Sequence, residues 1–344
     1  MPRIVKSHPT VFVTRPIADA ALEKLAAGAS VDLWNHEMPP PTAALFKHLG
    51  GADGVLSMIT DRLDAAAIAR APKLRVISNL GVGVDNIDLE AATSAGIVVC
   101  HTPGILTETT ADLAFALLMA AARRVAEADR YVRAGRWRTW GPKTMLGRDV
   151  HGATVGIIGW GAIGQAMARR GAGFGMRILY SSRHSRRGNT RYRATSSTSR
   201  VRAARPTQVS LNRLLSESDF VSLHVPLTPA THHLLGAREF ARMKAGAILI
   251  NTARGAVIDQ RALTDALRSG HLGGAGLDVT EPEPLARRDA MLEFDDVVIT
   301  PHIGSASIAT RERMAAIAVE NILAVFAGRM PRYCANASVK PRPR

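Results

Sequence analysis

Three polar residues with catalytic chemistry each follow an apolar stretch in the second half of the chain. Arg254 follows GAILINTA, Glu283 follows GAGLDVTEP and His302 follows VVITP. Each stretch is typical of a buried strand, and in open α/β sheets ligands bind beyond the carboxyl ends of the strands. We therefore expect the three side chains to face one crevice. Taken singly, each also suits a structural role, as an exposed Arg, a turn Glu or a capping His.

Together these side chains suit the reduction of a carbonyl that neighbours a carboxylate. Hydride arriving at the carbonyl carbon leaves charge on the oxygen, which a positioned acid must protonate. His302 can be that acid, because imidazole exchanges a proton near neutral pH, and a carboxylate such as Glu283 would favour its protonated form. Arg254 offers two parallel donors to a carboxylate. The set predicts hydride transfer to a 2-keto acid.

A glycine-rich turn supplies the place for a dinucleotide. In VGIIGWGAIG, Gly159, Gly161 and Gly164 form a G-x-G-x-x-G pattern that follows an apolar strand, 154–158, and opens a helical stretch, AIGQAMARR. In that context the glycines allow a tight turn, close approach to a pyrophosphate and close helix–strand packing, and the helix N-terminus attracts phosphate. The first strand of the chain turns into TRPIADAAL without a glycine, so we expect no dinucleotide there.

The residues after the next strand, MRILY, indicate which dinucleotide is preferred. An NAD-specific site usually has Asp or Glu there to hold the ribose 2′-hydroxyl, whereas this chain has Ser182 and Arg183. Arg183 can hold a 2′-phosphate, and a hydrogen bond to a charged group contributes roughly 1.5–3 kcal/mol. The sequence therefore predicts NADPH as the cofactor and disfavours NADH, unless Arg183 is merely solvated.

A second anion-binding turn is predicted in the first hundred residues. SNLGVGVDNID places Gly81, Val82 and Gly83 directly after a strand, where their backbone amides could surround a carboxylate. A plain strand-to-helix turn is the alternative.

Strand-like and helix-like stretches alternate along both halves of the chain. VFVTR, GVLSM, RVISN and GIVVC have strand patterns, and stretches such as ADAALEKLAA separate them. This alternation predicts βαβ units with parallel sheets. We expect one long helix at about 107–135 and a last helix at about 307–327 that packs on the first unit.

The predicted fold class is α/β, with two Rossmann-like parallel-sheet domains, the second inserted into the first. Residues 1–105 plus 304–344 would form the substrate-binding domain. Residues 106–303 would form the dinucleotide-binding domain, with an atypical basic insert at about 183–208.

Composition predicts a soluble cytoplasmic protein. The chain has 344 residues, 47% of them apolar and 21% charged, which suits two globular domains. Its two cysteines, Cys100 and Cys334, fit a reducing compartment and give no metal-ligand spacing, so no metal is expected. The N-terminal residues lack the apolar core of a signal peptide, and the longest apolar run, 113–122, is half of a membrane span.

The basic charge is concentrated in one segment. The net charge is +15, and nine arginines but no acidic residue lie between Ser181 and Ser216. A nucleic-acid surface would spread its charge over a face, and this segment has no aromatic residue but Tyr192. Nucleic acid is therefore disfavoured as a partner.

The motifs NLGVGVDNID, HTPGILTETTADLAFALLMAAARR, TVGIIGWGAIGQAMARR, INTARGAVID, GAGLDVTEPEP and TPHIGSAS carry a family resemblance. With them the chain resembles the D-isomer-specific 2-hydroxyacid dehydrogenases, and within these the glyoxylate/hydroxypyruvate reductases, also called 2-ketogluconate reductases. The resemblance implies a catalytic triad of Arg254, Glu283 and His302. It also implies that Val82, Gly83 and Arg254 bind the substrate.

The same resemblance implies a set of cofactor contacts and a homodimer. The contacts fall on Thr110, Gly159, Gly161, Ala162, Ile163, Gly164, Ser182, Arg183, Val225, Pro226, Thr231, Thr252, Ala253, Asp278, His302 and Gly304. Asp278 would hold the nicotinamide carboxamide, with a structural Asp at a strand end as the alternative. In related homodimers the long helix and the RWRTW region lie at the interface, and Trp140 would reach the partner's active site.

The resemblance fails between residues 188 and 208, whose Ser/Thr/Arg composition is typical of a disordered insert or of a local reading-frame change. The predicted function is NADPH-dependent reduction of glyoxylate, hydroxypyruvate or 2-ketogluconate to the D-2-hydroxy acid. Two alternatives stay open: an NAD-dependent relative of the phosphoglycerate or D-lactate type, and a dinucleotide-sensing co-repressor of the same fold.

Overall fold

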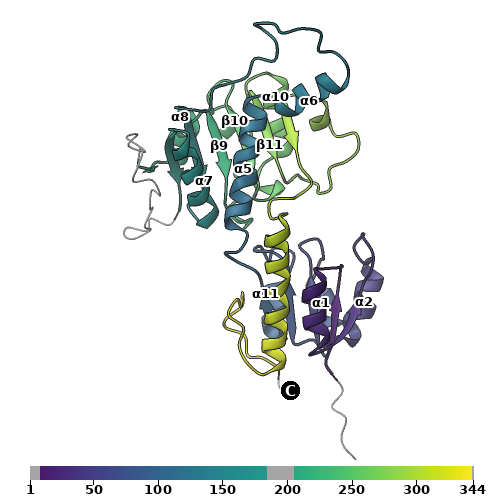
Figure 1. The fold of residues 1–344 in the computed structure, drawn as a ribbon. Helices are drawn as coiled ribbons and strands as arrows, with labels where there is room; N and C mark the ends of the chain where they lie inside the picture. Colours follow the sequence, from purple (N-terminus) through teal and green to yellow (C-terminus); the bar gives the residue numbers. More distant parts are fainter. Residues whose placement is uncertain (1–7, 184–204, 343–344) are drawn as a thin grey trace, which may run out of the picture. The chain divides into compact units, whose positions relative to one another are not determined.

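A computed structural model describes residues 8–183 and 205–342 (Figure 1). The chain divides into two compact units: unit 1, residues 1–106 and 306–344, and unit 2, residues 107–305. Each unit contains one fully parallel sheet, and helices connect its strands along the chain. The predicted fold class, two Rossmann-like parallel-sheet domains with the second inserted into the first, is confirmed.

Unit 1 contains a five-stranded sheet in the order β2-β1-β3-β4-β5. Its strands are β1 (Thr10–Val13), β2 (Ser30–Leu33), β3 (Gly54–Ser57), β4 (Val76–Asn79) and β5 (Val98–Cys100). Its helices are α1 (Asp19–Ala26), α2 (Thr42–Gly51), α3 (Ala65–Ala69), α4 (Leu89–Ser94) and α11 (Ile308–Phe326). The strand order reverses between β1 and β3, which is the position where open α/β sheets bind their ligands.

The two ends of the chain build unit 1 together. Helix α11 packs against α1 and against β3, β4 and β5, as the sequence predicted for the last helix. Beyond it, Asn336 is 7% exposed. Its side chain accepts a hydrogen bond from the Val99 amide at 2.8 Å and donates to Thr93 and to the Ile97 carbonyl, each at 2.9 Å. The C-terminal segment is therefore fixed to β5 and α4.

Unit 2 contains a seven-stranded sheet in the order β12-β11-β10-β9-β6-β7-β8. Its strands are β6 (Thr154–Ile158), β7 (Arg177–Ser181), β8 (Thr207–Gln208), β9 (Phe220–Leu223), β10 (Ile248–Asn251), β11 (Gly274–Leu277) and β12 (Val297–Ile299). Its helices are α5 (Thr107–Ala122), α6 (Val125–Arg133), α7 (Ala162–Gly173), α8 (Leu211–Glu217), α9 (Ala237–Phe240) and α10 (Gln260–Arg268), with 3₁₀ turns η1 (Gly255–Val257) and η2 (Ala290–Glu293). Here the strand order reverses between β6 and β9.

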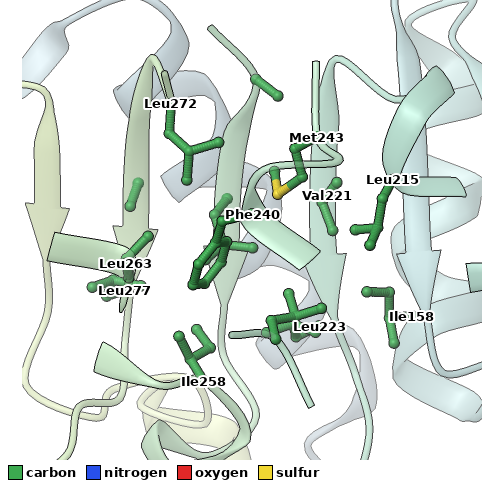
Figure 2. Packing of buried hydrophobic residues seen from close by; sticks show 14 of the residues in the cluster. Ile158, Leu215, Val221, Leu223, Phe240, Met243, Ile258, Leu263, Leu272 and Leu277 are labelled. Carbon is green, nitrogen blue, oxygen red and sulfur yellow. The ribbon is translucent and has the colours of Figure 1, made fainter. Parts of the chain in front are cut away.

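Both faces of the unit 2 sheet are apolar, because successive strand residues point to opposite faces. In β10, Ile248 and Ile250 pack in a cluster with residues of α5 and α7, whereas Leu249 packs in the cluster on the other face. Figure 2 shows that second cluster, in which Phe240 of α9 and Leu263 of α10 lie over the strands. Each such fully buried side chain contributes about 1.5–3 kcal/mol, so the sheet is a firm base for the loops at its carboxyl edge.

The prediction of one long helix at about 107–135 is wrong. Helix α5 ends at Ala122 and α6 begins at Val125, because Arg124 has a left-handed backbone with φ of 53°. The cause is a contact distant in sequence: the amide of Arg148 donates to the carbonyl of Ala122 at 2.8 Å. A Cβ on Gly147 would lie 2.4 Å from the same carbonyl oxygen, so this loop passes directly over the helix end.

The predicted insert is ordered at its carboxyl end. Thr207 and Gln208 form β8, which pairs in parallel with Leu179 and Tyr180 of β7. Disorder as far as residue 208 was therefore an incorrect expectation, because backbone pairing with a sheet edge overrides composition. Residues 184–204 lie outside the described residues. Within the described part of the chain, no helix is both long and apolar enough to cross a membrane.

Candidate active site

The glycine turn lies where the strand order of unit 2 reverses, between the ends of β6 and β9. Gly159 has φ of +101°, and a Cβ there would lie 2.3 Å from the carbonyl oxygen of His224. A Cβ on Gly164 would lie 2.1 Å from the carbonyl oxygen of Gly159. Both glycines are thus required by the protein's own packing. Gly161 differs, because a Cβ there would have no neighbour within 4 Å.

The open space at Gly161 adjoins the N-terminus of α7. Gly161 is the N-cap residue of this helix and has no side chain to accept the first helical amides. The amides of Ala162 and Ile163 therefore point out of the helix end toward any anion placed there. This arrangement fits the pyrophosphate of a dinucleotide.

A further polar atom suits the same ligand. The side-chain hydroxyl of Thr252, directly after β10, is buried and has no hydrogen-bond partner within the described residues. Buried hydroxyls are almost always paired in native proteins, so an unpaired one at the ligand-binding edge of a sheet points to a bound group. Ala253 follows it, and its amide donates to the Asn251 side chain at 3.0 Å.

Ser182 and Arg183 follow β7 beside the glycine turn. The amide of Gly159 donates to the carbonyl of Ser181 at 2.9 Å, which holds the two strand ends together. The guanidinium of Arg183 is exposed and donates to the carbonyl of Ala230 in the loop after β9. Neither Ser182 nor Arg183 carries a negative charge, so neither side chain would repel the 2′-phosphate of a dinucleotide.

The loop after β9 is closed by its own side chains. The hydroxyl of Thr231 donates to the Pro226 carbonyl at 2.6 Å and accepts from the Thr228 amide at 2.8 Å. Thr231 is 7% exposed, so its polar atom shapes the loop in which Val225 also lies. The cofactor contact predicted for Thr231 stays a prediction, and in the structure the Thr231 hydroxyl holds this loop together.

His224, at the start of this loop, was missed by the sequence reasoning. Its Nε2 lies 2.9 Å from the hydroxyl of Ser222. Although part of the residue reaches solvent, protein surrounds the ring, and this burial lowers the pKa of His224 to about 4. A neutral imidazole therefore stands beside the glycine turn at ordinary pH. A histidine after an apolar strand was the available signal.

Arg254 is held by the end of β10. Asn251 is fully buried, and its side-chain amide donates to the Arg254 carbonyl at 2.9 Å. The Arg254 guanidinium donates to the Ala253 carbonyl at 2.8 Å. A Cβ on Gly255 would lie 2.0 Å from the Thr280 carbonyl oxygen, so this turn packs tightly on the loop after β11. Asn251 was not singled out from the sequence, although it ends the same apolar strand.

His302 and Glu283 form a pair. The Nδ1 of His302 lies 2.5 Å from Oε1 of Glu283, where it can donate to the carboxylate. The two side chains are 25% and 35% exposed. This contact leaves Nε2 as the nitrogen of His302 that can exchange a proton with a substrate, and a carboxylate on the opposite nitrogen orients the ring.

Asp278 positions the turn that carries His302. It is 2% exposed, and its carboxylate accepts from the Thr300 hydroxyl at 2.6 Å, the Ile303 amide at 2.8 Å and the Gly304 amide at 2.7 Å. The His302 amide donates to the Asp278 carbonyl at 3.0 Å, with a left-handed φ of 54°. These contacts support the structural alternative for Asp278.

Thr110 lies in the same neighbourhood. It is 5% exposed on α5, and a Cβ on Gly304 would lie 3.6 Å from its hydroxyl and 3.1 Å from the Asp278 carboxylate. Trp140, by contrast, is 80% exposed in the irregular segment that follows α6. Its predicted role at a partner's site, and the homodimer itself, stay predictions.

Val82 and Gly83 are in unit 1, in the turn that follows β4. The Asn79 side chain donates to the Gly83 carbonyl at 2.9 Å, and His101 lies 2.8 Å from the Val82 carbonyl through Nδ1. Across residues 8–183 and 205–342, the amides of Val82 and Gly83 donate to no backbone carbonyl. The contacts to the Val82 and Gly83 carbonyls thus hold the turn, while the two amides can donate to an anion, as expected for an anion-binding nest.

Comparison with known proteins identifies the family of this chain. Residues 115–304 match the family model described as D-isomer specific 2-hydroxyacid dehydrogenase, NAD binding domain. The glyoxylate reductase of Korarchaeum cryptofilum is 49% identical over 337 residues, which is 97% of this chain and 98% of that protein.

Two solved structures show the same fold with different cofactors. An NADPH-dependent glyoxylate/hydroxypyruvate reductase from Sinorhizobium meliloti, in complex with NADP and malonate, is 31% identical, covers 98% of this chain and 100% of its own, and has a TM-score of 0.84. A D-lactate dehydrogenase from Aquifex aeolicus, complexed with NAD and lactic acid, is 28% identical, covers 95% and 99%, and has a TM-score of 0.81. By its sequence and its fold, the chain belongs to the D-isomer-specific 2-hydroxyacid dehydrogenase family, whose members are oxidoreductases that use a nicotinamide dinucleotide.

Proposed function

We propose that the protein is an NADPH-dependent reductase of small 2-keto acids, with glyoxylate, hydroxypyruvate and 2-ketogluconate as the candidate substrates. The observation that carries this proposal is the contact between His302 and Glu283 in the unit that also contains the glycine turn. A paired imidazole at a strand end is what a reductase needs to protonate a carbonyl oxygen. The glyoxylate reductase name of a relative at 49% identity supports the substrate class.

Each residue has a defined task in this proposal. When bound, the nicotinamide dinucleotide supplies the hydride. His302 gives a proton from Nε2 to the carbonyl oxygen, Glu283 orients the ring through Nδ1, and Arg254 binds the carboxylate and the carbonyl of the substrate. Asp278 keeps His302 in place through the turn it holds. The amides of Val82 and Gly83 bind the substrate carboxylate.

The preference for NADPH rests on the end of β7. Ser182 and Arg183 replace the carboxylate that would hold a ribose 2′-hydroxyl and would repel a phosphate. The Arg183 guanidinium is exposed and lies against the Ala230 carbonyl, close to the loop that follows β9. The S. meliloti relative, which is named NADPH-dependent, supports the same preference.

The test is a turnover assay with each of the three acids and with NADPH and NADH separately. We expect wild-type protein to oxidise NADPH with at least one acid, and His302→Ala to lose ~10²–10⁴ in kcat, because the general acid is gone. The matched control is His151→Gln, an exposed histidine of unit 2. Undiminished turnover by His302→Ala would remove this residue from the mechanism. Lack of turnover with all three acids would refute the substrate class.

A further inference from the structure

A cluster of two histidines and a glutamate lies outside the residues assigned so far. His232 and His233 end the turn after β9, and Glu281 follows β11. One ligand atom of each residue lies within 4.8 Å of the others, and Nε2 of His233 is 2.8 Å from Oε2 of Glu281. All three side chains reach solvent, so an ion could enter directly.

The backbone holds these three residues before any ion binds. The His232 amide donates to the Thr228 carbonyl at 2.9 Å, the His233 amide donates to the Ala256 carbonyl at 2.8 Å, and the Glu281 amide donates to the Gln260 side chain at 2.8 Å. The two chain segments that carry the three ligands are thereby fixed by hydrogen bonds to their surroundings, including a third segment that contains Ala256 and Gln260. Because folding already orders these side chains in part, metal binding would lose less conformational entropy, which favours binding.

The two imidazoles face the same side of the chain. Neighbouring side chains of an extended strand point in opposite directions, but His233 has a left-handed φ of 47°. The rings of His232 and His233 stack with centroids 4.0 Å apart. Two adjacent histidines therefore present nitrogen atoms to the same carboxylate, which a regular strand could not do.

We propose that His232, His233 and Glu281 bind a divalent transition-metal ion, with Zn²⁺ as the fitting example. Two imidazole nitrogens and a carboxylate oxygen are a known zinc ligand set, with solvent as the fourth ligand. Tetrahedral ligands at zinc distances lie about 3.3 Å apart, so no pair of these ligand atoms needs to approach by more than ~1.5 Å. The ion would join the loop after β9 to the loop after β11. This proposal does not depend on the proposed reductase activity.

The test is calorimetric titration of the full-length, tag-free, chelator-treated protein with ZnCl₂. We expect one Zn²⁺ per chain in wild type, and an affinity at least about 10-fold weaker in His233→Gln and Glu281→Gln, because even outer-shell partners of metal ligands contribute that much. The matched control is His151→Gln, which should bind as wild type does. In parallel, Co²⁺ should give the visible absorption bands of a tetrahedral site in wild type and in the control variant only.

Thermal unfolding without and with zinc separates loss of metal binding from loss of stability. Without metal, thermal unfolding should be nearly equal in all four proteins, because exposed side chains change stability by about 0.5 kcal/mol or less. At a zinc concentration near the wild-type Kd, zinc should raise the unfolding temperature of wild type and His151→Gln by more than that of the two ligand variants. Equal zinc affinity in wild type and Glu281→Gln, or binding without a fixed stoichiometry, would overturn the proposal and leave His233 and Glu281 as an ordinary surface ion pair.

Discussion

Each unit has a point where its strand order reverses, and the two points differ in the residues that surround them. In unit 1 the reversal lies between β1 and β3, and in unit 2 it lies between β6 and β9. Sheet geometry opens a crevice at both. Only the second has a glycine turn, so the comparison shows what turns a crevice into a binding site.

In unit 1 a buried carboxylate connects the ends of the two strands at the reversal. Asp61 is 3% exposed and accepts from the Thr14 hydroxyl, after β1, and from the Met58 amide at 2.7 Å, after β3. Arg15 lies 3.5 Å from the same carboxylate. Burial raises the pKa of Asp61, although the hydrogen bonds from Thr14 and Met58 and the charge of Arg15 lower it. The carboxylate of Asp61 thus links the end of β1 to the end of β3.

In unit 2 the corresponding position has no side chain to fill it. Gly159 and Gly164 let the turn close on itself, and Gly161 then leaves space at the N-terminus of α7. The difference between the units is therefore a few side chains on the same scaffold.

The largest expected effect is a difference in stability between alanine variants of two glycines in the same turn. Gly164→Ala places a methyl group 2.1 Å from a backbone oxygen and should destabilise unit 2 by roughly 3 kcal/mol or more. Gly161→Ala meets open space and should cost at most about 1 kcal/mol of stability, yet weaken NADPH binding by at least about 10-fold by blocking the close approach. Chemical denaturation and cofactor titration measure both. Equal stability losses would contradict the distinction.

In unit 1, Asp61→Ala should destabilise the fold by about 3 kcal/mol, because it leaves the Met58 amide, the Thr14 hydroxyl and Arg15 without their buried acceptor. Asp61→Asn keeps an acceptor oxygen and is the matched control, with a smaller loss. Denaturant unfolding followed by hydrogen exchange of unit 1 peptides is the measurement. If both variants were as stable as wild type, the contacts of Asp61 would not hold the ends of β1 and β3 together.

Acidification should affect the two crevices with opposite signs. The folded-state pKa of His224, about 4, is below the usual ~6.5, so the unfolded chain takes up its proton first and unit 2 loses stability as the pH falls below ~6.5, by about 2 kcal/mol at pH ~5. The raised pKa of Asp61 acts in the other direction, since the folded state protonates first. Hydrogen exchange of each unit at several pH values, in wild type and His224→Asn, tests this. An unchanged pH slope in His224→Asn would contradict it.

The smallest effect concerns cofactor choice. Arg183→Ala should lower the preference for NADPH over NADH by about 10-fold, which is about 1.4 kcal/mol and suits an exposed charge-assisted hydrogen bond. The ratio of kcat/KM for the two cofactors is the readout, and kcat with saturating NADH should not change. The exposed Arg213 of α8 provides a control variant, Arg213→Ala. A preserved ratio in Arg183→Ala would assign the 2′-position to other residues.

The sequence sufficed where short patterns encode the structure. The G-x-G-x-x-G turn and polar residues after apolar strands have local signals, which is why Gly161 and His302 could be singled out. What could not be predicted depends on distant contacts. The break at Arg124 arises from the Arg148 amide, and the role of Asp278 arises from a turn more than twenty residues later. Asp61 looks like any polar loop residue until β1 and β3 are adjacent.

Unit 1 and unit 2 differ in one more respect, which concerns how such a chain can be recombined. All of unit 2 is one continuous stretch, residues 107–305, whereas unit 1 needs both ends of the chain, including α11 and the Asn336 contacts. Two crossovers in a gene are therefore enough to exchange the whole nucleotide-binding cassette. A single crossover would build unit 1 from parts of two different parents, and a stop codon before α11 would leave it incomplete. Chimeric enzymes of this family are best built as cassette exchanges at residues 106–107 and 305–306.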